Sequence, residues 1–142
     1  MNGEFDIEKL ILKFRQAIYL HKSHLRKSAT ENGLYDGQLP ILEYIIKNDG
    51  CTQTDIAKFM NVTSASVATS VKRMENSGLI KRSTDTDDMR YNRLSICEDG
   101  LNRAKECRNC FNRIDHTMFS GLTEEERRIF CDCLDKMIKN LS

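Results

Sequence analysis

Residues 52–78 read TQTDIAKFMNVTSASVATSVKRMENSG and predict two short helices joined by a tight turn. Apolar residues recur at helical spacing in two blocks, at about 53–60 and 64–76, with a turn of about three residues between them. That arrangement is the spacing of a helix-turn-helix motif. Residues that start or stop helices stand at the expected places, which are Thr52 with Asp55, Thr63, and Gly78.

The second of these helices is expected to bury one face and to offer the other to DNA. Val67, Val71 and Met74 are spaced i, i+4, i+7 and are expected to face the core. The opposite face is short and polar near the helix start and basic further along, so it would fit against base edges and phosphates in a major groove. Its residues are Ala65, Thr69 and Lys72, flanked by Ser66, Ala68 and Arg73. The alternative is an ordinary solvated surface helix.

The periodicity then changes to that of a β-hairpin. Residues 79–83 and 90–97 are typical of short strands, with Leu94 and Ile96 on one face, and residues 84–89 form a polar loop. A hairpin directly after two such helices is the winged helix-turn-helix plan, and an arginine on a protruding ribbon can enter a minor groove. The charged hairpin residues of interest are Arg82, Asp88, Arg90 and Arg93. The alternative is an ordinary hairpin with a local Asp–Arg pair.

Long amphipathic helices are predicted on both sides of the motif. The predicted elements are a helix over 6–28, a helix capped by Asp36 and running to about 48, a helix over about 98–119, and a last helix opened by Thr123 and Glu126. The fold class is therefore mainly α with a small β-hairpin wing, in a single domain over 1–142. Its winged helix-turn-helix DNA-binding region is 36–97, and its helical dimerisation region is 1–35 and 98–142.

The apolar stripes of the first and last helices are broader than one small domain can cover, which predicts a homodimer. The residues expected at the dimer interface are Ile7, Leu10, Phe14, Phe130, Leu134, Met137, Ile138 and Leu141.

The composition is typical of one globular domain, with 142 residues, 39% hydrophobic and 30% charged. No run approaches the roughly 18 apolar residues needed to span a bilayer, and the polar, acidic start is unlike a signal peptide. We therefore expect a cytoplasmic protein with no membrane partner. The net charge is +1, and residues 50–97 are the most basic part, with seven Lys and Arg against five Asp and Glu. Such a small excess is a weak argument for nucleic acid.

Residues 52–100 resemble the MarR family of bacterial transcriptional regulators. The most specific resemblance is the Asp88-Met89-Arg90 wing, followed by alternating apolar residues and Gly100, and the flanking helices match along nearly the whole chain. The resemblance implies a homodimeric repressor that binds a pseudo-palindromic double-stranded operator, with half-sites about 34 Å apart. It also implies that Arg90 enters a minor groove and that a small-molecule effector or an oxidant releases the DNA.

The residues expected at the DNA are Thr52, Thr63, Ser64, Ala65, Ser66, Thr69, Lys72, Arg73, Arg82, Asp88, Arg90 and Arg93. Three positions depart from the family pattern. Met89 replaces a Lys or Arg beside the wing arginine, Thr69 stands where many members carry an arginine, and Cys97 replaces the usual threonine helix cap.

The chain also has six cysteines and three histidines, which raise the alternative of a thiol- or metal-responsive regulator. Cys107 and Cys110 share a helix face, but Cys131 and Cys133 are about 200° apart, which argues against a four-thiolate metal site. We expect the cysteines to be small buried apolar residues, and His21 and His24 to have a surface or packing role. We expect no metal and no cofactor.

No arrangement of residues typical of an active site is found, so an enzyme is the least favoured class. The remaining alternative is a winged-helix protein-interaction module without DNA binding, for which the weak net charge and the acidic wing tip argue.

Overall fold

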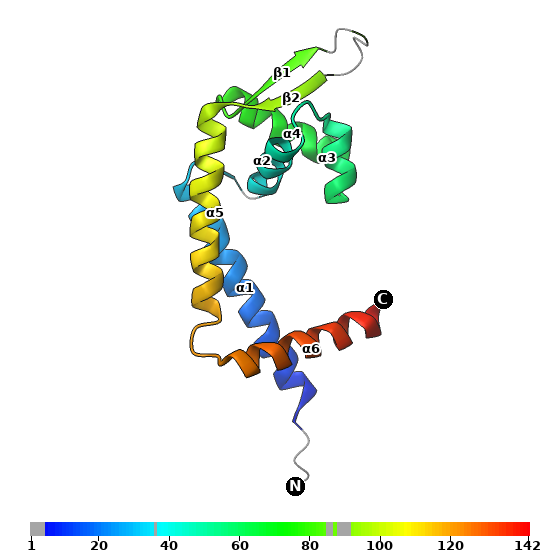
Figure 1. Ribbon diagram of the computed structural model, residues 1–142. Coiled ribbons are helices and arrows are strands. Elements are labelled where there is room, and N and C mark those ends of the chain that lie inside the picture. Colours follow the sequence, from blue (N-terminus) through cyan, green and yellow to red (C-terminus); the bar gives the residue numbers. More distant parts are fainter. Residues whose placement is uncertain (1–4, 36, 85–86, 88–91) are drawn as a thin grey trace.

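The structure is a computed structural model that describes residues 5–35, 37–84, 87 and 92–142. The fold is mainly helical with one antiparallel hairpin, as the sequence predicts (Figure 1). The elements in chain order are α1 (Ile7–Glu31), α2 (Gln38–Lys47), α3 (Gln53–Met60), α4 (Ser64–Asn76), β1 (Ile80–Thr84), β2 (Asn92–Ile96), α5 (Glu98–Met118) and α6 (Glu124–Leu141).

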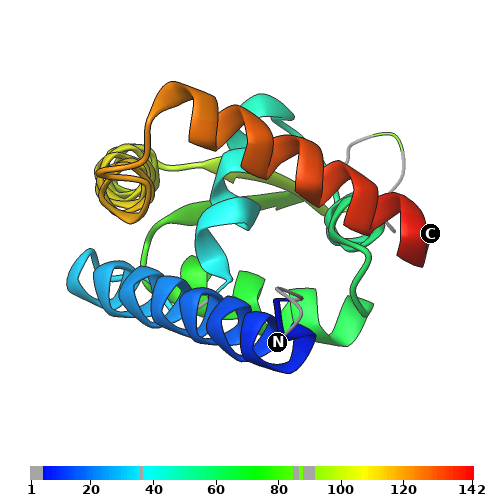
Figure 2. The same cartoon turned by 90° about the horizontal axis from the view of Figure 1, so that it is seen from below.

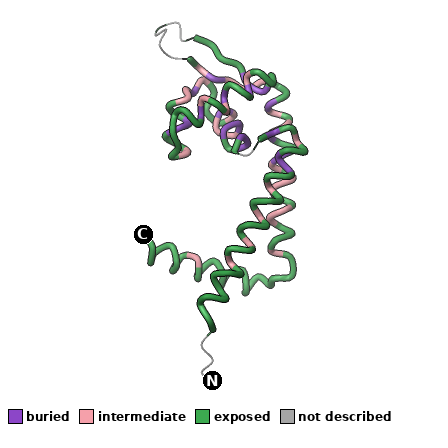
Figure 3. Tube along the Cα trace, turned by 180° about the vertical axis from the view of Figure 1, so that it is seen from behind, coloured by how far each residue is buried: buried purple, intermediate pink, exposed green. Residues whose placement is uncertain are grey.

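The elements from α2 to β2, residues 38–96, form a compact unit that we call the winged head. Buried residues gather in this head and at its junction with α1 and α5 (Figure 3). The predicted core residues Val67, Val71 and Met74 of α4 are at most 1% exposed, which confirms the buried face of that helix. They pack in one cluster with Leu39, Leu42, Ile45, Ile56, Leu79 and Leu94.

The hairpin is anchored to the head by its base. Ile80 pairs with Ile96 and Arg82 pairs with Leu94, so these residues share one face of the ribbon. Leu94 is fully buried and also forms a bridge with Cys51, which precedes α3. The hairpin therefore has a fixed direction relative to α3 and α4. The part of the predicted second strand at residues 90 and 91 lies outside the described residues.

Two predicted helix boundaries need correction. The first helix runs to Glu31, three residues beyond the predicted end at 28, because Asn32 ends it by donating from Nδ2 to the Ser28 carbonyl at 2.8 Å. The second begins at Gln38, with Gly37 at the N-cap in a left-handed conformation at φ 81° and without a side-chain cap. The predicted cap, Asp36, lies outside the described residues.

The helices α1, α5 and α6 form an extended unit that we call the stem. Helix α5 runs directly on from β2 and packs against α1, so it links head and stem (Figure 1). Figure 2 looks along α5 and shows α1 and α6 both extending from it toward the same side of the molecule. Helix α6 contains no buried residue. Among the described residues, no helix is both long and apolar enough to cross a lipid bilayer.

Candidate nucleic-acid interface

Two side-chain N-caps determine the residues at which the helices α3 and α4 begin. The hydroxyl of Thr52 accepts from the Asp55 N–H at 3.2 Å, and the Thr52 N–H donates to the Asp55 carboxylate at 2.9 Å, so the predicted capping box is confirmed. Hydrogen bonds from the Thr52 backbone hold the pKa of the Asp55 carboxyl below its ordinary value of 3.8. The Thr63 hydroxyl accepts from the Ser66 N–H at 3.2 Å and caps α4 in the same way.

The face of α4 opposite the core is open to solvent. Ser64, Ala65, Ser66, Thr69, Lys72 and Arg73 are all exposed. The Thr69 hydroxyl donates to the Ala65 carbonyl at 3.1 Å, so it is held against its own helix. Small side chains in the first two turns and two cations in the third give this face a shape and charge that fit a major groove.

The cations around α4 have different partners. Arg82 on β1 donates from Nε to the Glu75 carboxylate at 3.2 Å and ties the hairpin to α4. Arg93 on β2 is half-buried and donates to the Gly50 carbonyl at 3.4 Å. Arg73 instead lies over the ring of Tyr35, with its Cζ 5.0 Å from the ring centroid.

The two wing residues on which the family resemblance depends most, Asp88 and Arg90, lie outside the described residues. Thr52 and Thr63, also expected at the DNA, have the capping roles given above, and Thr52 is only half-exposed.

The residues expected at a dimer interface lie on the stem and are open in the single chain. Ile7 is 78% exposed, Ile138 63% and Leu141 90%. Leu10, Phe130 and Met137 are also exposed, whereas Phe14 and Leu134 are half-buried. These side chains give the stem an exposed apolar surface in the single chain.

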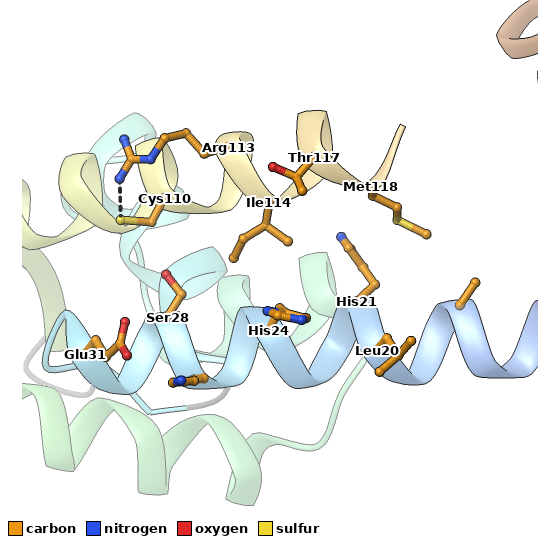
Figure 4. A pocket seen from close by; sticks show the side chains of 12 residues that line it. Leu20, His21, His24, Ser28, Glu31, Cys110, Arg113, Ile114, Thr117 and Met118 are labelled. Atoms are coloured by element: carbon orange, nitrogen blue, oxygen red, sulfur yellow. Dashed lines mark hydrogen bonds between the residues drawn. The ribbon is translucent and has the colours of Figure 1, made fainter. Parts of the chain in front are cut away.

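A cavity of about 650 Å³ lies between α1 and α5. Figure 4 shows His21 and Ser28 of α1 pointing toward α5, whose Cys110, Ile114 and Thr117 line the other wall. The walls combine apolar side chains with Lys27, Arg113 and Glu31. His21 Nε2 lies 2.7 Å from an Asp115 carboxylate oxygen, and this pair joins the two helices near one end of the cavity.

The six thiols divide into three groups, which are buried, half-exposed and exposed, and Cys97 belongs with Cys110 to the half-exposed group. Cys51 and Cys107 are buried, and burial raises the pKa of each thiol to about 11, which keeps both protonated and unreactive. The expectation that the cysteines are buried is wrong for Cys131 and Cys133, which are exposed on α6. Cys110 is half-exposed, and its sulfur accepts from Arg113 Nη2 at 3.1 Å. Within the described part of the chain, no three His, Cys, Asp or Glu side chains are placed to hold a metal ion.

Sequence reasoning missed two features of the site. It named no residue of the cavity between α1 and α5, because contacts between these helices join distant positions, such as His21 and Asp115, which are 94 residues apart. It also missed Tyr35, since no periodicity relates a residue before α2 to an arginine of α4.

Comparisons with known proteins agree with this geometry. Residues 34–91 match the model of the MarR family. The HTH-type transcriptional regulator BilQ of Clostridium symbiosum is 29% identical over 118 residues, which cover 83% of this chain and 79% of that protein. An uncharacterized HTH-type transcriptional regulator of Bacillus subtilis, YdgJ, is 26% identical over 78% of this chain and 67% of that protein.

Solved structures extend the similarity to nearly the whole chain. The Staphylococcus aureus MepR–DNA complex superposes with a TM-score of 0.77 at 27% identity, covering 96% of this chain and 99% of that one. The match includes the stem as well as the winged head. The chain is therefore similar to the MarR family of winged helix-turn-helix transcriptional regulators, over residues 34–91 by the family model and over nearly its whole length by structure.

Proposed function

We propose that this regulator is a homodimer that binds a pseudo-palindromic double-stranded operator and represses transcription from it. The observation that carries the proposal is the exposed face of α4, where small polar side chains precede Lys72 and Arg73. In each subunit α4 would enter a major groove, with Ser64, Ala65, Ser66 and Thr69 at base edges and the cations at phosphates. The DNA-bound form of the relative MepR supports this assignment.

The hairpin would supply the second contact of each subunit. Arg90, in the segment of sequence between β1 and β2, is our proposed minor-groove residue. Arg82 would contact phosphate after loosening its pair with Glu75. Arg93, held by the Gly50 carbonyl, would shape the base of the hairpin and support such contacts indirectly.

The proposal assigns DNA binding and dimerisation to different regions of the chain. Residues 36–97 would bind DNA, and residues 1–35 and 98–142 would hold the dimer together. The exposed apolar side chains of α1 and α6 support a second copy of the chain as the partner of the stem. Such a regulator needs no enzymatic activity and would act in the cytoplasm, where bacterial DNA is found.

We further propose that a small-molecule effector occupies the cavity between α1 and α5 and weakens DNA binding. The cavity has the volume and the mixed apolar and charged walls typical of a ligand site. A change in the angle between α1 and α5 would reach the head, because α5 continues directly from β2. If peroxide releases the DNA from the wild-type protein but not from Cys110→Ser, regulation belongs instead to this thiol.

Selection from a random double-stranded DNA pool, at two salt concentrations, tests the central proposal. We expect an enriched two-fold symmetric sequence with half-sites one helical turn apart and an affinity that falls steeply with salt. The reduced, ligand-free protein should be used, so that an effector does not mask binding. A pool without enrichment would overturn the proposal and favour a winged-helix module that binds another protein.

A further inference from the structure

We propose that Tyr35 is a positioning residue of the DNA interface, which holds the guanidinium of Arg73 in place for a backbone phosphate at the edge of the major groove. The inference rests on the proposed function, because it concerns how one contact of that interface is prepared. The geometry that points to it is the 5.0 Å separation between Arg73 Cζ and the centroid of the Tyr35 ring.

Arg73 belongs to the face of α4 that is proposed to meet DNA. It follows Thr69 by four residues, as Thr69 follows Ala65, so the three side chains lie along the same side of the helix. All three are exposed. An arginine at the end of this row would meet the sugar–phosphate edge while the smaller residues face the bases.

Tyr35 is anchored firmly enough to hold a long side chain. Its backbone N–H donates to the Gln38 Oε1 at 3.0 Å, and its carbonyl accepts from the Gln38 N–H at 3.1 Å. Gln38 and the neighbouring Leu34 are each 2% exposed, so the backbone on which Tyr35 sits is part of the packed head. The ring itself is not part of the core, because Tyr35 is 60% exposed.

A neutral aromatic ring suits this task better than a carboxylate does. Glu75 compensates the charge of Arg82 and competes with phosphate for its N–H groups. The face of a ring attracts the guanidinium but leaves the full positive charge and the N–H edges available to an anion. Holding the side chain before binding also lowers the conformational entropy that is lost when DNA is bound.

The test compares Tyr35→Leu, Tyr35→Phe and the wild-type protein on one operator sequence, at several salt concentrations. Tyr35→Leu removes the ring face, and Tyr35→Phe keeps it but removes the hydroxyl. We expect Tyr35→Leu to bind about tenfold more weakly, since a contact of this kind is lost in both half-sites, and Tyr35→Phe to bind like the wild type. Thermal unfolding of each variant checks that the head is intact.

A double mutant separates positioning from a direct contact by the ring. In an Arg73→Ala background, Tyr35→Leu should cause no further loss of DNA affinity, because the guanidinium that the ring positions is already absent. The inference is overturned if Tyr35→Leu binds DNA as tightly as the wild type. It is also overturned if Tyr35→Leu lowers the DNA affinity by the same factor whether Arg73 is present or replaced by alanine. A Tyr35→Phe variant as weak as Tyr35→Leu would overturn it too, because that result would assign the effect to the hydroxyl. If the wild-type protein binds no DNA at all, the proposed function itself fails; if it binds and Tyr35 has no influence, only this inference does.

Discussion

At the scale of single residues, the side chains of the proposed interface do two kinds of work. Thr52, Thr63 and Asp55 fix where the helices begin, and they do so by hydrogen bonds to backbone N–H groups. Lys72 and Arg73 instead place charge on the open face of α4. Substituting the first group should change the stability of the fold, whereas substituting the second should change DNA binding.

Lys72→Ala should weaken DNA binding to a similar degree on every sequence, because Lys72 is proposed to contact phosphate and not bases. Each lost phosphate contact lowers the slope of log affinity against log salt by about 0.9, so two subunits should lower it by roughly two. Fluorescence anisotropy across a salt series measures the slope. Lys139→Ala, on α6 at the far end of the stem, is the matched control, and the proposed role fails if both lysine variants keep the wild-type slope.

Asp55→Asn should make the acid stability of the protein less dependent on pH. The folded-state pKa of Asp55 lies below its ordinary value of 3.8, so the ionised carboxylate stabilises the fold at pH values above 3.8. That contribution is lost as the pH falls below 3.8 through the folded-state pKa. Urea unfolding between pH 2 and pH 6 should therefore show a smaller decline in the unfolding free energy for Asp55→Asn. If the unfolding free energy of Asp55→Asn declines with falling pH as steeply as that of the wild type, the ionised Asp55 carboxylate does not contribute to the pH dependence of stability.

At the scale of elements, the junction between the hairpin and α5 determines how the head sits on the stem. The Cys97 N–H donates to the Leu79 carbonyl at 2.9 Å, and the buried Gly100 passes beneath the same carbonyl group. A Cβ at position 100 would overlap the Leu79 carbonyl oxygen and crowd the Ile96 side chain. The glycine is therefore required by close packing between two elements.

Gly100→Ala should destabilise the protein by about 1–3 kcal/mol, even though alanine is the better helix former. The added methyl group meets backbone, which has little freedom to move away. Asn102→Ala, at an exposed position of the same helix, is the control and should be neutral or slightly stabilising. Chemical denaturation measures both variants, and a Gly100→Ala protein as stable as the control would contradict the packing argument.

The elements were also the part of the molecule best predicted from sequence. The bounds of α3 and α4 follow from Thr52, Thr63 and strict apolar spacing, and the structure reproduces both ranges. Contacts between distant segments could not be predicted, because a pattern within one helix carries no information about its neighbour. The His21–Asp115 pair and the Tyr35–Arg73 contact are of this kind. The exposure of Cys131 and Cys133 was missed because a cysteine alone does not indicate which helix face is buried.

At the scale of the whole molecule, the stem of a single chain has many apolar side chains exposed to solvent. The winged head has its own core, but α6 buries no residue within the chain. A second copy would cover the apolar sides of α1 and α6 and would set the separation of the two α4 helices. Dimerisation and DNA recognition are therefore expected to depend on each other.

Ile138→Lys should shift the protein toward monomer and reduce operator binding by more than tenfold. Ile138 is 63% exposed on α6, and the substitution places a charge where the partner's apolar residues are proposed to pack. Asp132→Lys adds a lysine to the opposite side of the same helix and should leave the dimer intact. Sedimentation equilibrium gives the oligomeric state, and a dimeric Ile138→Lys protein with normal affinity would exclude this surface as the interface.

The most direct test of the account is the dependence of affinity on the spacing between operator half-sites. Two α4 helices held by one rigid stem can reach two major grooves only on the same side of the duplex, about 34 Å apart. Inserting five base pairs, half a helical turn, between selected half-sites should reduce affinity to that of a single half-site. Equal affinity for the original and the extended operator would contradict a dimer that reads both half-sites at once.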